Sequence, residues 1–172
     1  PAINPPAAAI GLDGLERVVT YLKRAVDDGN DRDARWNMMM AASEGAMAFA
    51  KGLGSVHSMS HAVGANEELQ AHHGTLNAIF LPTVLRFNAA HVDDKYAQLR
   101  RAMGLTAKAN ISDWISEYNM SLGLPENLGA MGVVDDMVPD LAAHCMTDAC
   151  HFSNPKRPTV EEYEVMFVEA IG

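Results

Sequence analysis

Apolar side chains recur every three or four residues along most of the chain, which is the spacing of one face of an α-helix. One clear stripe consists of Leu15, Val18, Val19, Leu22 and Val26. The turn Asp28-Gly29-Asn30 follows it, and Asp31 then has the position of an N-cap for a second helix. No stretch alternates convincingly with the period of two that is typical of a β-strand. The pattern therefore predicts an all-α protein, a bundle of about seven to nine helices.

The rest of the chain continues this pattern. We expect Ser55 to cap a short helix that ends near Gly64, and a longer helix to follow His73. Pro82 is expected to kink or restart that longer helix, because proline lacks the backbone N–H donor. Further helical patterns cover about 93–103, 109–121, 135–150 and 159–171. Residues 1–9 are rich in Pro and Ala, and we interpret them as an extended, linker-like segment.

Composition fits an ordinary globular protein. The chain has 172 residues, of which 48% are hydrophobic and 20% charged, so we expect 1–172 to form a single domain. Aromatic residues make up only 6%, whereas Met occurs 11 times, a mixture that favours helix packing over sheets. Trp36 and Met39 fall on helical stripes and are expected in the core.

Charge and cysteine content exclude several classes of protein. The net charge of −9 and the lack of a Lys/Arg cluster argue against nucleic-acid binding. No apolar run reaches the ~18 residues of a membrane span, and the first residues lack the pattern of a signal peptide. Cys145 and Cys150 form neither a C-x-x-C motif nor a disulfide framework. We therefore expect a cytoplasmic protein.

Histidines supply the candidate chemistry. Four of the seven lie close together, His57, His61, His72 and His73. His57 and His61 are one helical turn apart on the same face, and His73 can fold back toward them beside the flexible Gly74. Imidazole is the commonest transition-metal ligand in proteins and also moves protons near neutral pH. A metal site is the first hypothesis, and a histidine cluster that serves only packing is the alternative.

A longer pattern surrounds these histidines. The segment 52–65 reads GLGSVHSMSHAVGA, and His73-Gly74 and then N-A-I-F-L-P from Asn77 follow it. Together with Leu122-Gly123-Leu124-Pro125, Asp148-Ala149-Cys150 and Asn154-Pro155-Lys156-Arg157, these motifs resemble the pattern of the iron-containing (group III) alcohol dehydrogenases. The resemblance covers nearly the whole chain.

The resemblance implies a fold and an activity. The chain would be the C-terminal helical domain of a dehydroquinate-synthase-like two-domain fold, in an NAD(P)-dependent alcohol dehydrogenase. Enzymes of that family transfer hydride between a small alcohol or aldehyde and the nicotinamide of NAD or NADP, with the help of a divalent metal. Fe²⁺ is the expected metal and Zn²⁺ is the alternative. By motif position, His57 and His73 would be metal ligands. His61 would touch nicotinamide or substrate and carry the alcohol proton, and Cys150 would line the cofactor cleft.

Two departures from the family pattern shape these expectations. The segment between His61 and His73 is about two residues longer than the commonest family spacing, which leaves His72 as the alternative ligand to His73. The family's other two ligands, in a D-x-x-x-H motif, and its N-terminal nucleotide-binding domain are absent from this chain. We therefore expect a C-terminal fragment that is inactive alone, needs the missing domain as its partner and forms homo-oligomers.

Two alternatives remain open. The chain could be a non-enzymatic helical module that binds metal or serves as an interaction subunit. It could also belong to a related branch of the same superfamily, such as the maleylacetate reductases or the glycerol dehydrogenases.

Overall fold

The computed structural model describes residues 3–172, and these contain eight α-helices, five short 3₁₀-helices and no β-strand. The all-α prediction is confirmed. None of the described helices is both long enough and apolar enough to span a membrane. The α-helices are α1 (Pro5–Asp27), α2 (Arg32–Ala48), α3 (Gly54–Gly64), α4 (His73–Asn88), α5 (Asp93–Ala102), α6 (Ile111–Ser121), α7 (Val138–Thr147) and α8 (Val160–Ile171). The 3₁₀-helices are η1 (Phe49–Lys51), η2 (Ala89–His91), η3 (Gly129–Met131), η4 (Asp135–Met137) and η5 (Ala149–Ser153).

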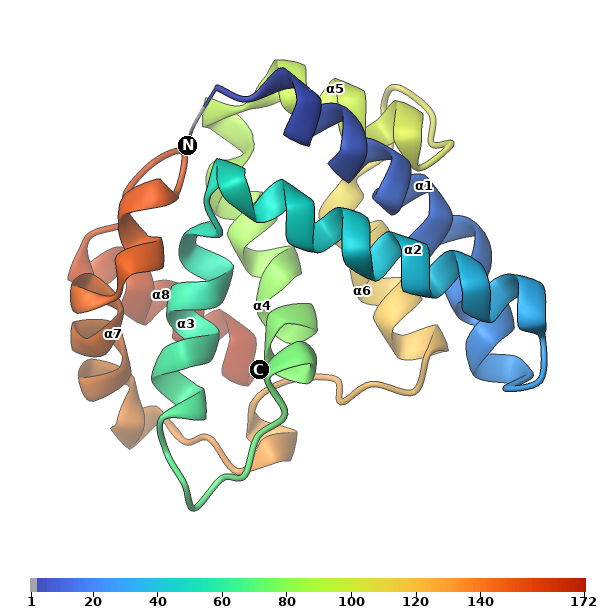
Figure 1. The fold of residues 1–172 in the computed structure, drawn as a ribbon. Coiled ribbons are helices and arrows are strands. Elements are labelled where there is room, and N and C mark those ends of the chain that lie inside the picture. The colour runs from blue at the N-terminus through green and yellow to red at the C-terminus, as the bar shows by residue number, and fades with distance from the viewer. Residues whose placement is uncertain (1–2) are drawn as a thin grey trace. The chain divides into compact units, whose positions relative to one another are not determined.

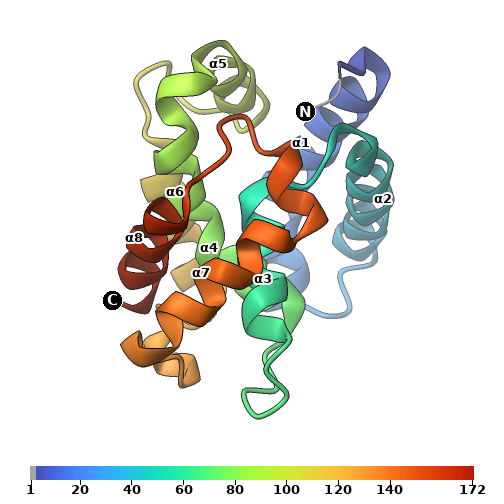
Figure 2. The same cartoon turned by 90° about the vertical axis from the view of Figure 1, so that its left-hand side faces the viewer.

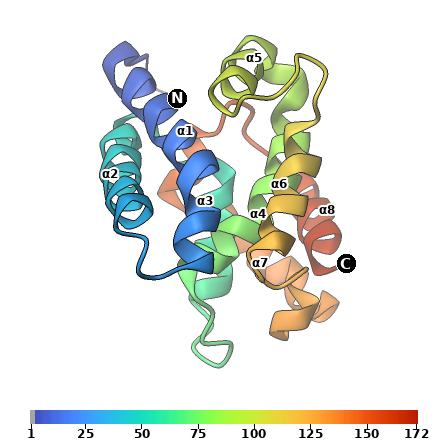
Figure 3. The ribbon, with the colours of Figure 1, turned by 90° about the vertical axis from the view of Figure 1, so that its right-hand side faces the viewer.

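The helices form two compact units. One consists of residues 3–52 and 92–109, and the other of residues 53–91 and 110–172. In the first unit α1 and α2 lie side by side and antiparallel, and α5 packs against α1 (Figures 1 and 3). Arg17 of α1 links this helix to α2. It donates a hydrogen bond to Asn37 Oδ1 at 2.7 Å and lies 3.2 Å from the Glu44 carboxylate.

Two expectations for the first unit are wrong. Residues 5–9 are helical, because Asn4 caps α1 and Pro5 occupies a first-turn position that needs no N–H donor. Residues 1–2 of the expected linker lie outside the described part. Trp36 and Met39 are 57% and 72% exposed, since α2 turns a narrow face that includes Ala34 toward α1 and leaves its large side chains outside.

The second unit holds the larger core. Helix α3 packs against α4 and α7, while α8 packs against α4 and α7 as well, and α6 lies along α4 (Figures 1 and 2). Phe80 of α4 and Phe167 of α8 are fully buried and meet edge to face, with ring centroids 5.5 Å apart. Around them lie the other fully buried side chains, which include Met59, Val63, Leu76, Leu128, Val133, Cys145 and Tyr163.

Helix α4 runs through Pro82 without a restart, which was one of the two effects expected there. The expected helix over 135–150 is instead divided into η4, α7 and η5. The second break occurs at Asp148, whose extended backbone ends α7 while its carboxylate accepts a hydrogen bond from the Cys150 amide at 2.8 Å. An aspartate that caps the next turn competes with continuation of the helix.

Helix α3 is capped from a distant part of the chain. Ser55 lies inside the helix and does not cap it, contrary to expectation. The Gly54 amide instead donates to Ser153 Oγ and the Ser55 amide donates to Asn154 Oδ1, both at 3.1 Å. Gly54 has φ +72°, and a Cβ atom there would lie 2.8 Å from Asn154 Oδ1. The approach of the two segments therefore requires glycine.

The Asn154 side chain uses all four of its hydrogen-bonding positions. Its oxygen accepts from the Ser55 amide and from Asn88 Nδ2 at 3.3 Å. Its nitrogen donates to Asn88 Oδ1 at 2.9 Å and to the Lys156 carbonyl at 2.6 Å. Asn154 and Asn88 are 4% and 7% exposed. One buried carboxamide thus joins the start of α3, the end of α4 and the segment after η5.

This connection is testable by stability. Asn154→Ala leaves the Ser55 amide and the buried Asn88 side chain without partners, so we expect the free energy of unfolding to fall by about 3 kcal/mol. The control Asn30→Ala, on an exposed turn, is expected to change it by less than about 0.5 kcal/mol. Chemical denaturation followed by circular dichroism measures both. A loss below about 1 kcal/mol for Asn154→Ala would contradict the account.

Candidate metal and proton-transfer site

Three histidine rings meet at one place in the second unit. Helix α3 carries His57 and His61 one turn apart, and His73 is the first residue of α4. The ring centroids are 5.8 Å apart for His57 and His61, 5.2 Å for His57 and His73, and 5.3 Å for His61 and His73. Two helices that pack against each other thus bring together the residues that the sequence singled out.

His72 has a different place. It is the N-cap of α4, and its Nδ1 accepts a hydrogen bond from the Thr75 amide at 3.4 Å. The ring of a capping residue is directed at the backbone of its own helix, whereas the His73 ring is stacked on His61. Of the two neighbours, the geometry favours His73 as the member of the cluster.

Polar neighbours hold the His73 ring on both sides. Ser60 Oγ lies 3.4 Å from His73 Nδ1, and Asn77 Nδ2 lies 3.0 Å from His73 Nε2. Asn77 Oδ1 is buried and has no hydrogen-bond partner among the described residues. Turning this amide would pair its oxygen with an Nε2–H and place the lone pair of the neutral ring on Nδ1, 3.4 Å from Ser60 Oγ. A carboxamide that can orient an imidazole in this way is a typical supporting partner of a metal-binding histidine.

The electrostatics of the cluster favour neutral rings at His57 and His73. Burial lowers the pKa of His57, and the neighbouring His73 and His61 lower it further. Burial also lowers the pKa of His73, with contributions from His61 and His72. Neutral imidazoles keep a lone pair available at neutral pH, whereas protonated rings at these separations would repel one another. The donor set therefore fits a divalent cation.

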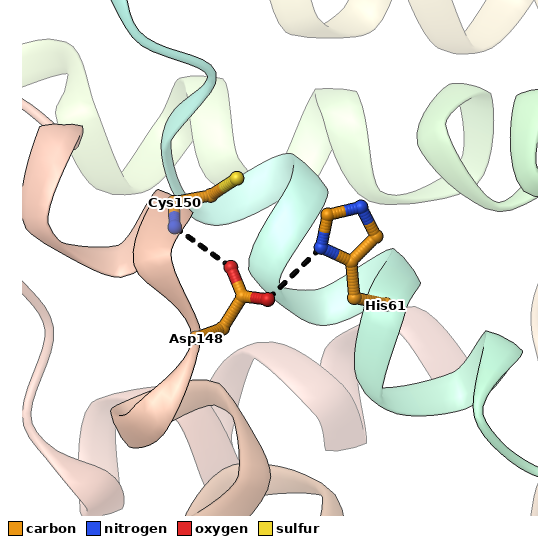
Figure 4. A group of neighbouring side chains, drawn as sticks. All are labelled: His61, Asp148 and Cys150. Atoms are coloured by element: carbon orange, nitrogen blue, oxygen red, sulfur yellow. Dashed lines mark hydrogen bonds and ion pairs between the residues drawn. The ribbon is translucent and has the colours of Figure 1, made fainter.

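His61 has a second partner, Asp148. Its Nδ1 lies 3.0 Å from Asp148 Oδ2, and the other carboxylate oxygen accepts from the Cys150 amide at 2.8 Å (Figure 4). That second oxygen also accepts from Ser58 Oγ at 3.3 Å. Burial opposes ionisation of Asp148, but the hydrogen bonds from His61 and Cys150 outweigh it and lower the pKa of Asp148. An ionised carboxylate only accepts hydrogen bonds, so His61 carries its proton on Nδ1 and leaves Nε2 as an acceptor.

Cys150 lies beside the same pair. One ligand atom each from His61, Asp148 and Cys150 all lie within 4.8 Å of one another. Burial and the Asp148 charge raise the pKa of the Cys150 thiol to about 11, so it is a neutral thiol at physiological pH. The other thiol, Cys145, is fully buried on α7.

The site contains residues to which the sequence alone assigned no role. Asp148 stood out only as part of the motif Asp148-Ala149-Cys150, and its contact with His61 spans 87 positions of sequence. Asn77 and Ser58 likewise lie inside sequence motifs, in which neither had a role of its own. The motifs marked where these residues are, but pairings between distant segments depend on the packing of α3 against η5.

Comparison with known proteins gives a consistent family. Residues 2–171 match the family model for the C-terminal part of the Fe-containing alcohol dehydrogenases. The chain is 48% identical over 178 residues to a 4-hydroxybutyrate dehydrogenase from Cupriavidus necator, which covers 99% of this chain and 47% of that protein. It is 35% identical over 176 residues to alcohol dehydrogenase 4 of Schizosaccharomyces pombe, and this match covers 99% of this chain and 41% of that protein. The chain thus spans about half the length of these relatives.

Solved structures have the same fold. A crystal structure of 1,3-propanediol oxidoreductase matches with a TM-score of 0.90 at 29% identity, over 97% of this chain and 46% of that chain. An alcohol dehydrogenase from Oenococcus oeni matches with a TM-score of 0.89 at 28% identity, over 97% of this chain and 45% of that chain. Both likenesses extend over nearly all of this chain.

The pairing of His61 with Asp148 is testable by NMR. In two-bond ¹H–¹⁵N spectra, at a pH where the ring is neutral, we expect His61 as the Nδ1–H tautomer. Asp148→Ala removes the acceptor, so the tautomer should move toward Nε2–H. Asp148→Asn keeps an acceptor oxygen and is expected to retain more of the Nδ1–H form. An unchanged tautomer in Asp148→Ala would show that another group orients the ring.

Proposed function

This chain belongs to the Fe-containing alcohol dehydrogenase family and matches the C-terminal part of its members. We therefore propose that it supplies one side of the active site of an NAD(P)-dependent alcohol dehydrogenase. The observation that carries the proposal is the convergence of three imidazole rings, with centroids 5.2–5.8 Å apart, at the junction of α3 and α4. Clustered imidazoles are costly to bring together unless they share a cation or a proton network.

We assign His57 and His73 as two ligands of a divalent metal, Fe²⁺ in first place and Zn²⁺ in second. When bound, such a cation acts as a Lewis acid toward the oxygen of an alcohol or aldehyde. His57 and His73 keep their lone pairs because burial lowers the pKa of each ring. Asn77 and Ser60 hold the His73 ring in place. Two imidazoles leave the ligand set incomplete, so metal binding by this chain alone should be weak.

His61 is proposed as the residue that carries the proton. Its Nδ1–H donates to Asp148, so Nε2 is the atom that accepts a proton from the alcohol oxygen during oxidation and returns it during aldehyde reduction. A bound nicotinamide would supply the hydride chemistry at the substrate carbon. The His61 side chain is 39% exposed, which leaves it accessible to a substrate. Asp148 acts as a positioning residue, since its carboxylate fixes the orientation of the ring.

Cofactor and substrate complete the proposal. Cys150 lies beside the His61–Asp148 pair and is proposed to line the cleft for NAD or NADP. The nucleotide itself would be held by a separate N-terminal domain. We propose 4-hydroxybutyrate as the substrate, because the identity of 48% to a 4-hydroxybutyrate dehydrogenase exceeds the 35% to an alcohol dehydrogenase. The two free thiols fit a reducing compartment such as the cytoplasm.

A non-enzymatic metal-binding module is the second candidate function. It would bind its metal tightly with the ligands of this chain alone, whereas an enzyme domain with two of its ligands elsewhere would bind it weakly. Homo-oligomers fit either role. The exposed Trp36 and Met39 offer apolar surface for such contacts.

The metal ligands are testable on this chain. We expect anaerobic calorimetric titration with Fe²⁺ to give weak binding that falls at least about tenfold in His57→Ala and in His73→Ala. His144→Ala changes an exposed histidine outside the cluster and serves as the matched control. Unchanged Fe²⁺ affinity in both cluster variants would overturn the ligand assignment. Tight Fe²⁺ binding by the unaltered chain would favour the self-contained module.

A further inference from the structure

His61, Asp148 and Cys150 form a group with a chemistry of its own. The group combines an imidazole, a carboxylate and a thiol, and one ligand atom from each lies within 4.8 Å of the other two (Figure 4). Helix α3 supplies His61, whereas Asp148 and Cys150 stand two residues apart around the start of η5. None of the three is assigned above as a metal ligand.

The spacing of these atoms is close to that of a zinc site. In a tetrahedral site with bonds of about 2.0–2.3 Å, the ligand atoms stand roughly 3.3–3.8 Å apart. His61 Nδ1 and Asp148 Oδ2 are already 3.0 Å apart, so small side-chain rotations would bring the three donors onto one cation. Three protein ligands with a fourth position open to water is the usual arrangement of accessible zinc sites.

The backbone around the group limits how far it must rearrange. Asp148 is fixed by the Cys150 amide and by Ser58 Oγ, so the carboxylate is already directed toward α3. The Asp148 side chain is 15% exposed and the His61 side chain 39%, which gives a cation a route from solvent. The mixed donor set favours a borderline-soft ion over Mg²⁺ or Ca²⁺, which prefer oxygen ligands.

We propose that His61, Asp148 and Cys150 form a second divalent-cation site, selective for Zn²⁺ and separate from the His57–His73 pair. Binding replaces the hydrogen bond between His61 and Asp148 with two bonds to the cation. The imidazole proton moves from Nδ1 to Nε2, and the Cys150 thiol releases one proton to solvent, so the ion is held by one thiolate, one carboxylate and one neutral imidazole.

Occupation of this site has a consequence that rests on the proposed function. In the proposed function, His61 accepts the substrate proton on Nε2. A ring bound to zinc through Nδ1 would already carry a proton on Nε2 and could not accept another. Zinc at this site would therefore act as an inhibitor, even while another cation occupied the His57–His73 pair. The existence of the site does not depend on that assignment, because its ligands are different residues.

Cobalt absorption distinguishes the two sites. Co²⁺ is a spectroscopic substitute for Zn²⁺, and a bound thiolate gives it an intense near-ultraviolet charge-transfer band that imidazole does not give. We expect this chain to develop the band on Co²⁺ addition and Zn²⁺ to abolish it. Cys150→Ser should eliminate the band and lower the Zn²⁺ affinity at least about tenfold. His57→Ala should retain the band.

Each outcome bears on one proposal. A band that is absent at saturating Co²⁺, or one that survives in Cys150→Ser, would overturn the second site. A band lost in His57→Ala would show that the sulfur and the histidine pair share a single ion, which also overturns it. If His57→Ala loses Fe²⁺ binding but keeps the cobalt band, both sites are supported. If His57→Ala keeps both Fe²⁺ binding and the cobalt band, the result counts against the proposed function alone.

Alkylation offers a measurement on the unaltered chain. Cys150 is partly exposed and Cys145 is fully buried, so iodoacetamide should modify Cys150 first, as mapped by mass spectrometry. We expect Zn²⁺ to slow this modification at least about tenfold, and the protection to disappear in His61→Ala. Equal rates with and without Zn²⁺ in the unaltered chain would contradict the site.

Discussion

The Asn154 carboxamide is the interaction on which the geometry of the site depends. It caps α3 through the Ser55 amide, pairs with Asn88 near the end of α4 and follows η5 directly. Those three elements carry the histidine cluster and the Asp148–Cys150 segment. Gly54 permits the approach because no other residue would fit its φ of +72° and the contact with Asn154. A single buried side chain thus sets the relative positions of residues far apart in sequence.

Within that frame, closely spaced histidines acquire different properties. His57 and His73 are kept neutral by burial and by their neighbours, which suits them to a cation. His61 faces an ionised carboxylate, which fixes its tautomer and suits it to proton transfer. His72 caps α4 and turns to its own backbone. The difference between the rings follows from the packing partner of each.

Local patterns in the sequence predicted most of the fold, because helix periodicity and turn residues act over a few positions. The start of α2 at its cap Asp31 and the cluster formed by His57, His61 and His73 followed from such patterns. The break of the 135–150 helix and the partnership of His61 with Asp148 did not, because both depend on contacts with other elements. The exposure of Trp36 was missed for a related reason, since an apolar stripe does not reveal which face of α2 packs on α1.

We propose that this chain supplies His57 and His73 as metal ligands and His61 as the proton carrier of a dehydrogenase. The most direct test replaces the matching 178 residues of the Cupriavidus necator 4-hydroxybutyrate dehydrogenase with this chain and measures NAD-linked oxidation of 4-hydroxybutyrate. We expect turnover by the chimera, none by the isolated chain, and a loss of at least about a hundredfold when His57→Ala, His73→Ala or His61→Ala is introduced into the chimera. Turnover by the isolated chain, or a chimera whose activity survives all three substitutions, would contradict it.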